Sequence, residues 1–359
     1  MSDQQHHEQP LNPDDAAVLD NFAYVPDRDQ ALDHDHCFLC GSKLTEENRT
    51  DEHVFPRWVQ REFDLYDLRM GLPNDTEIRY RQLTIPCCQD CNGRWLSQLE
   101  DEVSSAFRAG PDAFEALGPV TLGLWLSKIY YGLLFKDISL ALDRSDPSSG
   151  PLLEPQWLTT YFELHQVLQV IRGALELTED QVPASVFVFR TLDSEITANR
   201  FDFRDTTAFP FIALRLGPVG LVGCLLDWGS VAGALDIKDV AEAQSIELHP
   251  TQFLQVAALL AHWRIRFNRV PKYMIGGGSG DGPDQLITMP IGGLSGLPVF
   301  DEFEPDLYAN LLAAFTGFPL DRVRNAAKKT LWNTLKKPDG SLAGVPNIEE
   351  YRFEPPDEL

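Results

Sequence analysis

The sequence predicts an α+β fold in which a small metal-stabilised module precedes a larger domain of helices and antiparallel strands. Three observations support this prediction. Five of the six cysteines crowd the first quarter of the chain, whereas a disulfide scaffold is short, secreted and rich in cysteine throughout. Apolar residues recur with helical spacing in several long segments. Runs of β-branched and aromatic residues between positions 184 and 229 are separated by Gly, Pro and Asp, as strands are.

We expect three parts along the chain. Residues 1–30 are polar, acidic and interrupted by prolines, which predicts a flexible arm. Residues 31–108 form the cysteine-rich module. This module closes on a helix that begins near Asp90, because Trp95, Leu99 and Val103 recur at the spacing of one buried helical face. Residues 109–359 form the larger domain, and the sequence leaves its role open between a sensor, an oligomerisation unit and a DNA-binding unit.

The elements of the larger domain follow from its periodicity. Helices are expected over residues 118–143, 156–177, 250–267, 305–315 and 320–335, and strands over 184–192, 209–217 and 219–229. The glycine-rich segment 276–283 lacks the Lys-Ser/Thr of a phosphate-binding loop, so a flexible loop is expected there. In the last helix Arg322, Lys329 and Lys336 recur every seven residues. This spacing suits a basic stripe for the DNA backbone or an ordinary solvated face.

The composition sets limits on location and partners. The most apolar stretch, residues 120–140, contains Lys128, Lys136 and Asp137, which favours a buried helix over a membrane span. The first residues do not resemble a signal peptide, so we expect a cytoplasmic protein without a membrane partner. The net charge of −24 argues against a protein that coats nucleic acid. It permits an enzyme with a local basic groove, or one that a partner brings to its substrate.

Two Cys-x2-Cys pairs carry the strongest chemical signal, because each can present two thiolates to one tetrahedral zinc ion. The pairs are Cys37 with Cys40 and Cys88 with Cys91. Cys87 could replace Cys88 as a ligand, but the spacing favours Cys88 and leaves Cys87 as a small buried residue. The loop between the pairs contains Asp51-Glu52-His53-Val54-Phe55-Pro56. An acid beside an imidazole suits metal-assisted hydrolysis.

Together with the trailing residues Cys91, Asn92, Trp95, Leu99 and Glu100, these motifs make residues 33–105 resemble the HNH endonuclease superfamily, in the branch with Glu-His-Val-x-Pro and Cys-x2-Cys-Asn. The resemblance implies a ββα-metal module. It implies that His53 is the general base that takes a proton from the attacking water. It also implies that Glu52 and Asn92 hold a catalytic Mg²⁺ or Mn²⁺, which prefer oxygen ligands.

Several assignments within this site have alternatives. Asp51 could replace Glu52 as the metal ligand. The asparagine that orients the base in the family has no counterpart before the second cysteine pair, and Gln82 or Asn74 could take its place. Glu100 lies two helical turns beyond Asn92, where it is either a further metal ligand or an exposed acid. Four arginines are either phosphate contacts or solvated side chains, namely Arg57, Arg79, Arg81 and Arg94.

The function we expect is that of a metal-dependent DNA endonuclease. Two alternatives remain, a zinc-ribbon interaction protein without catalysis and a nuclease that acts on RNA. Because a nuclease module is joined to a larger domain in a very acidic chain, we also expect regulation, as in a bacterial antiviral defence effector. A ligand, a protein partner or homo-oligomerisation would then activate it.

Overall fold

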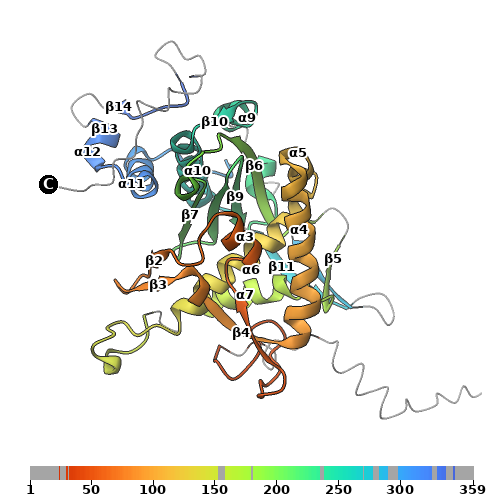
Figure 1. The fold of residues 1–359 in the computed structure, drawn as a ribbon. Helices are drawn as coiled ribbons and strands as arrows, with labels where there is room; N and C mark the ends of the chain where they lie inside the picture. Colours follow the sequence, from red (N-terminus) through yellow and green to blue (C-terminus); the bar gives the residue numbers. More distant parts are fainter. Residues whose placement is uncertain are drawn as a thin grey trace, which may run out of the picture.

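The computed structural model describes residues 24, 30, 32–152, 158–178, 181–234, 238–269, 271–277, 283–289, 298–325, 330–336 and 343 (Figure 1). The fold is mixed α+β, as the sequence predicts. Apart from a few residues, the predicted N-terminal arm and the centre of the glycine-rich segment lie outside the described residues. No helix in the described ranges combines the length and the apolar character that crossing a membrane requires.

The cysteine-rich module is built on an antiparallel hairpin of β1 (Arg49–His53) and β4 (Thr84–Cys88), in which His53 pairs with Thr84 and Arg49 with Cys88. The chain then enters a π-helical turn, η2 (Cys91–Leu96), which continues as α4 (Ser97–Ala109). This confirms the helix expected from near Asp90. Between the two strands lie α3 (Arg57–Glu62), the 3-10 turn η1 (Tyr80–Gln82) and a small hairpin of β2 (Arg69–Gly71) and β3 (Glu77–Arg79).

A five-stranded sheet forms the centre of the larger domain. Its strand order is β10-β6-β9-β8-β7, and only β10 runs parallel to its neighbour. The strands are β6 (Ala184–Thr191), β7 (Phe201–Thr206), β8 (Phe211–Leu216), β9 (Val219–Leu225) and β10 (Glu247–Leu248). The three strand segments read from the sequence are β6, β8 and β9, so the predicted antiparallel sheet is confirmed.

Two long helices cover the two faces of this sheet (Figure 1). Helix α6 (Gly118–Asp137) packs on one face and α10 (Pro250–Arg266) on the other. Two glycines of β9 make these contacts close. A Cβ atom at Gly220 would lie 2.5 Å from the Phe253 ring of α10, and one at Gly223 would lie 2.8 Å from Leu126 of α6. Because strand residues alternate between faces, both helices can approach the same strand closely.

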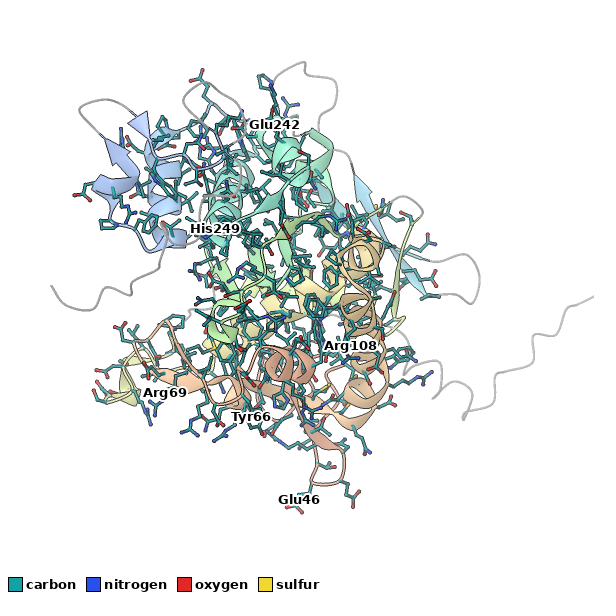
Figure 2. All side chains as sticks on the ribbon, turned by 45° about the horizontal axis from the view of Figure 1, so that its top comes forward. Glu46, Tyr66, Arg69, Arg108, Glu242 and His249 are labelled. Atoms are coloured by element: carbon teal, nitrogen blue, oxygen red, sulfur yellow. The ribbon has the colours of Figure 1, made fainter. Side chains whose placement is uncertain are left out.

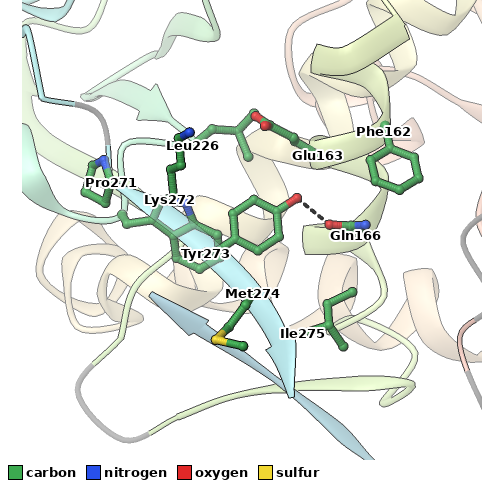
Figure 3. Close-up of a pocket in the computed structure, with 10 residues that line it drawn as sticks. Phe162, Glu163, Gln166, Leu226, Pro271, Lys272, Tyr273, Met274 and Ile275 are labelled. Carbon is green, nitrogen blue, oxygen red and sulfur yellow. Dashed lines mark hydrogen bonds between the residues drawn. The ribbon is translucent and has the colours of Figure 1, made fainter. Parts of the chain in front are cut away.

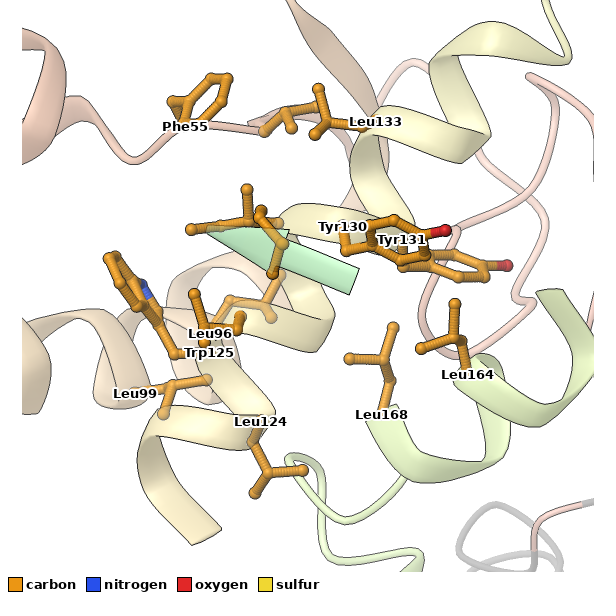
Figure 4. Packing of buried hydrophobic residues seen from close by; sticks show 14 of the residues in the cluster. Phe55, Leu96, Leu99, Leu124, Trp125, Tyr130, Tyr131, Leu133, Leu164 and Leu168 are labelled. Atoms are coloured by element: carbon orange, nitrogen blue, oxygen red, sulfur yellow. The ribbon is translucent and has the colours of Figure 1, made fainter. Parts of the chain in front are cut away.

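One hydrophobic core joins the cysteine-rich module to α6 and to the near face of the sheet. Figure 4 shows Trp125, Tyr130 and Tyr131 of α6 packed among leucines of α4 and of α7 (Leu158–Leu168). The module therefore shares its apolar core with the larger domain. A second core lies between the far face of the sheet, α10 and α11 (Pro305–Thr316).

The remaining elements are short. A three-stranded sheet has the order β11-β12-β5 and consists of β5 (Leu175–Leu177), β11 (Lys272–Gly276) and β12 (Asp284–Met289). Short helices and turns are α5 (Pro111–Glu115), η3 (Pro147–Ser149), η5 (Thr197–Asn199), α8 (Ser230–Ala234) and α9 (Lys238–Gln244). Figure 2 shows Glu46, Tyr66 and Arg69 of the cysteine-rich module at one end of the molecule, and Glu242 and His249 toward the other.

Three helix predictions were too long. The predicted helix 118–143 ends at Asp137, and the predicted helix 156–177 ends at Leu168, after which the chain turns into β5. The predicted helix 320–335 is a single turn, α12 (Leu320–Val323), followed by the strand pair β13 (Arg324–Asn325) and β14 (Thr330–Leu331). This hairpin lets Trp332 pack on Phe318. Lys329 lies outside the described residues. The seven-residue stripe is wrong as a helical face, because Arg322 lies in α12 and Lys336 lies after β14.

Asp137 at the end of α6 should make stability depend on pH. Its side chain is 7% exposed, and burial together with nearby Asp205 raises the pKa of Asp137 to about 7. A raised pKa in the folded state means that stability falls as the pH rises from about 4 to 7, because folding opposes ionisation. We expect Asp137→Asn to stabilise the chain by on the order of 2 kcal/mol at pH 8 and by little at pH 4.5.

Urea unfolding at the two pH values measures this effect, with Asp101→Asn on the exposed side of α4 as the control. Equal effects of Asp137→Asn at both pH values would contradict a raised pKa of Asp137 in the folded chain.

Candidate functional site

The four cysteines of the two Cys-x2-Cys pairs converge. Their sulfur atoms all lie within 4.8 Å of one another, and the sulfurs of Cys40 and Cys88 are 3.7 Å apart. Cys37 and Cys40 lie on the turn before β1, whereas Cys88 ends β4 and Cys91 begins η2. Hydrogen bonding with Cys37 lowers the pKa of Cys40 to about 6, which favours a thiolate. The group can hold a metal ion such as zinc.

Cys87 does not belong to this group. It is fully buried, and its sulfur lies 3.9 Å from that of Cys37. Adjacent residues of a strand point to opposite sides, so Cys87 and Cys88 cannot both face the metal site. The spacing argument for Cys88 therefore agrees with the structure.

Strand β1 divides the predicted hydrolytic residues between its two faces. Thr50 and Glu52 share one face, and Asp51 and His53 share the other. Glu52 is buried, Asp51 is exposed and His53 is intermediate. The side-chain amide of Asn92 donates to Thr50 Oγ1 at 3.0 Å and more weakly to the Asp51 carbonyl at 3.4 Å. The start of the helix thus places Asn92 against Thr50 and Asp51, whereas His53 lies at the end of β1 that pairs with Thr84.

A lysine that the site prediction did not include lies against Glu52. Lys128 of α6 is fully buried, and its ammonium donates to Glu100 Oε1 at 2.7 Å and to the His53 carbonyl at 2.9 Å. It also forms an ion pair with Glu52. Burial alone would lower the pKa of Lys128, but the charges of Glu100 and Glu52 outweigh it and raise the pKa. The larger domain therefore supplies the cation that balances two acids of the module.

Glu100 is part of this buried cluster, so the alternative of a fully exposed acid is wrong. Its side chain is 19% exposed, and burial raises the pKa of Glu100 to about 7 despite the opposing charge of Lys128. The signal for this cluster was present in the sequence. A lysine inside the most apolar segment needs a buried anionic partner, and the sequence pattern did not show which one.

His53 lies at the end of β1 with a partly buried imidazole. Arg57 Nε donates to His53 Nδ1 at 3.3 Å. Burial lowers the pKa of His53, and the positive charge of Arg57 lowers it further. The ring is therefore neutral at neutral pH. Because Arg57 can only donate, Nδ1 carries the lone pair and Nε2 carries the proton.

Neither residue expected to orient His53 does so. Gln82 accepts a hydrogen bond from the backbone N–H of Arg79 at 3.3 Å, which closes η1. Asn74 donates to the Ala141 carbonyl at 3.1 Å. Both predictions were wrong because Gln82 bonds within its own turn and Asn74 bonds to a distant segment, and in the described residues Arg57 is the side chain bonded to the imidazole.

Of the four predicted phosphate-binding arginines, Arg57 is the one bonded to a site residue. Arg79 and Arg81 both pair with Asp67, Arg79 at 3.6 Å. Arg94 lies over the Trp95 ring, with its guanidinium carbon 4.2 Å from the ring centroid. Asp67 therefore partly neutralises the charges of Arg79 and Arg81 within the module. Both arginines lie far from His53 in the sequence.

Fewer ligand atoms are available for a second, catalytic metal ion than for an ion in the four-cysteine group. Within the described ranges, the four cysteines are the group of at least three His, Cys, Asp or Glu ligands close enough to share one ion. Glu52 and Asn92 can offer a carboxylate and an amide oxygen beside the same face of β1, and both are ligands that Mg²⁺ accepts. The ammonium of Lys128 already lies against Glu52. Such a metal would therefore bind beside an existing cation.

Comparisons with protein-family models, with curated proteins and with solved structures found no match for this chain.

Proposed function

We propose that the chain is a metal-dependent endonuclease that hydrolyses phosphodiester bonds of DNA, with His53 as the general base. The observation that carries the proposal is the arrangement of one hairpin and one helix around His53. Strand β1 ends at His53, β4 pairs with it, and the helix that starts at Cys91 brings Asn92 against β1. The four-cysteine group joins the ends of these elements. This order of elements is the one that resemblance to the HNH superfamily implies.

The base function follows from the surroundings of His53. The lone pair of Nδ1 takes a proton from water while the water oxygen bonds to phosphorus and the bond from phosphorus to the 3′ oxygen breaks. The leaving oxygen receives a proton from solvent. Without substrate, Arg57 Nε donates a hydrogen bond to His53 Nδ1. A substrate phosphate attracts this guanidinium by a charge-assisted hydrogen bond, which frees Nδ1 for the water.

The residues beneath His53 keep it in place. Lys128 donates to the His53 carbonyl and pairs with Glu52, so the end of β1 is tied to α6. A divalent Mg²⁺ or Mn²⁺, held by Glu52 and Asn92, would neutralise charge on the phosphate. Asp51 is the alternative ligand, because it is exposed on the same strand face as His53.

A panel of substrates and metals tests the proposal. Purified protein is incubated with plasmid DNA, linear DNA and RNA, each with Mg²⁺, Mn²⁺ or EDTA. We expect cleavage of DNA with either metal and none with EDTA. Cleavage of RNA but not of DNA would mean that the substrate is RNA. No cleavage of any substrate would overturn the proposal in favour of a zinc-ribbon interaction protein.

Two isosteric variants decide which acid binds the metal. Glu52→Gln and Asp51→Asn each remove one charge and retain the side-chain shape. If Glu52 is the ligand, Glu52→Gln should raise the Mg²⁺ concentration needed for half-maximal cleavage by about 10-fold or more, and Asp51→Asn should leave it nearly unchanged. The reverse pattern would assign the metal to Asp51.

A further inference from the structure

A second candidate site lies in the larger domain, away from the β1–β4 hairpin. A cavity of about 620 Å³ lies between α7, β11 and the turn that follows β9 (Figure 3). This volume is in the range of small-molecule sites. Glu163 and Gln166 line it from α7, Lys272 and Tyr273 line it from β11, and Leu226 and Trp228 line it from the turn.

The turn after β9 is held in an unusual conformation. Leu226 and Trp228 both have left-handed backbone angles, with φ of 57° and 54°. Such angles cost roughly 1–2 kcal/mol for each residue with a side chain, and they persist where the surroundings enforce them. Asp227 between them enforces them here. It is fully buried and accepts hydrogen bonds from the backbone N–H and hydroxyl of Ser185 and from the Val231 N–H at 2.8 Å.

This conformation fixes an aromatic wall. The ring of Trp228 packs on that of Tyr273, with centroids 5.0 Å apart and planes at 40°. The Tyr273 hydroxyl donates to Gln166 Oε1, as the dashed line in Figure 3 shows. The turn after β9 therefore positions the Trp228 ring, and Gln166 of α7 positions the Tyr273 ring. A preorganised aromatic wall favours a flat ring in the cavity.

The polar groups around the wall carry both signs of charge. Glu163 has no hydrogen bond or ion pair with any described residue, so its carboxylate is available to donors in the cavity. Lys272 is exposed and likewise forms no ion pair within the described part of the chain. Arg264 of α10 is buried, its Nε has no hydrogen-bond partner, and its charge acts on Glu163. The cavity lining thus offers one acceptor of N–H donors, Glu163, and one cation, Lys272, while Arg264 lies outside the lining.

We propose that this cavity binds a guanine nucleotide, with the base on the Trp228–Tyr273 wall, its N–H edge on Glu163 and its phosphate toward Lys272. Guanine has two adjacent N–H groups, at N1 and N2, that a carboxylate can accept together. Adenine offers an N–H beside an acceptor, which a carboxylate serves less well. A hydrogen-bonding site rejects an analogue that leaves its polar groups unpaired. The inference is independent of the nuclease activity.

Isothermal titration calorimetry of the full chain with GMP, AMP and guanosine tests the proposal. We expect GMP to bind at least about 10-fold more tightly than AMP, and guanosine to bind more weakly than GMP. Glu163→Gln should weaken GMP binding about 10-fold and leave AMP nearly unchanged. Lys272→Gln should weaken GMP and leave guanosine nearly unchanged.

The controls are Glu176→Gln on β5 and Lys238→Gln on α9, which change the same residue types outside the cavity. Both should bind GMP as the original chain does. No heat of binding with about 1 mM GMP at either of two temperatures would overturn the proposal, since a binding enthalpy that is zero at one temperature differs from zero at another. GMP binding that Glu163→Gln and Lys272→Gln leave unchanged would also overturn it.

Discussion

Replacement of Lys128 by methionine should destabilise the folded chain by about 3–5 kcal/mol, because it removes the cation from a buried pair of carboxylates. Glu52 is 6% exposed, and both it and Glu100 form ion pairs with Lys128. Without the lysine, both acids must stay charged without a partner or become protonated. Urea unfolding at pH 7.5 measures the loss.

A compensating variant separates charge from packing. Adding Glu52→Gln and Glu100→Gln to Lys128→Met removes the uncompensated charges and should recover most of the lost stability. Lys136→Met on the same helix is the matched control, because Lys136 is only partly buried and forms no ion pair with the described residues. Its effect should be below about 1 kcal/mol. No recovery in the triple variant would contradict the electrostatic explanation.

We expect the four-cysteine group to bind zinc, and we expect removal of the zinc to unfold the cysteine-rich module. Structural zinc contributes on the order of 10 kcal/mol to small modules, which is comparable to the whole stability of a domain. The core of this module continues into α6 and the central sheet. We therefore expect Cys40→Ser to lose about one zinc per chain and to lower the unfolding temperature of the whole protein.

Zinc content by elemental analysis and thermal unfolding by calorimetry measure the two effects. Cys87→Ala is the control, because Cys87 is buried beside the group without belonging to it. It should retain the zinc. Equal loss of zinc from both variants would mean that the ligand set is different. Full zinc retention by Cys40→Ser would also mean that the ligand set is different.

The local parts of the site were predictable from the sequence. Two Cys-x2-Cys pairs can serve one ion only if the chain between them returns on itself, and the hairpin of β1 and β4 does this. The helix from Asp90 followed from apolar residues spaced by four. The strands β6, β8 and β9 followed from their β-branched runs. For the helix and the strands, the information lies within a short stretch of the sequence.

The parts that the sequence did not predict depend on contacts between distant segments. Lys128 meets His53 across 75 residues, and no spacing rule connects them. The hydrogen bond from Arg57 to His53 depends on how α3 follows β1. The predicted C-terminal helix 320–335 had a helical pattern of charges, but packing of Trp332 on Phe318 favours a hairpin there. Tertiary packing outweighs local propensity at such positions.

The most direct test of the nuclease proposal is the single-turnover rate of DNA cleavage by His53→Ala with Mg²⁺. The account predicts a rate about 100-fold to 10,000-fold below that of the original chain, as expected for loss of a general base. The control is His34→Ala, an exposed histidine before the first cysteine pair, which should cleave at the original rate. Zinc content and unfolding temperature should be the same in all three proteins. Equal cleavage rates for His53→Ala and the original chain would contradict the account.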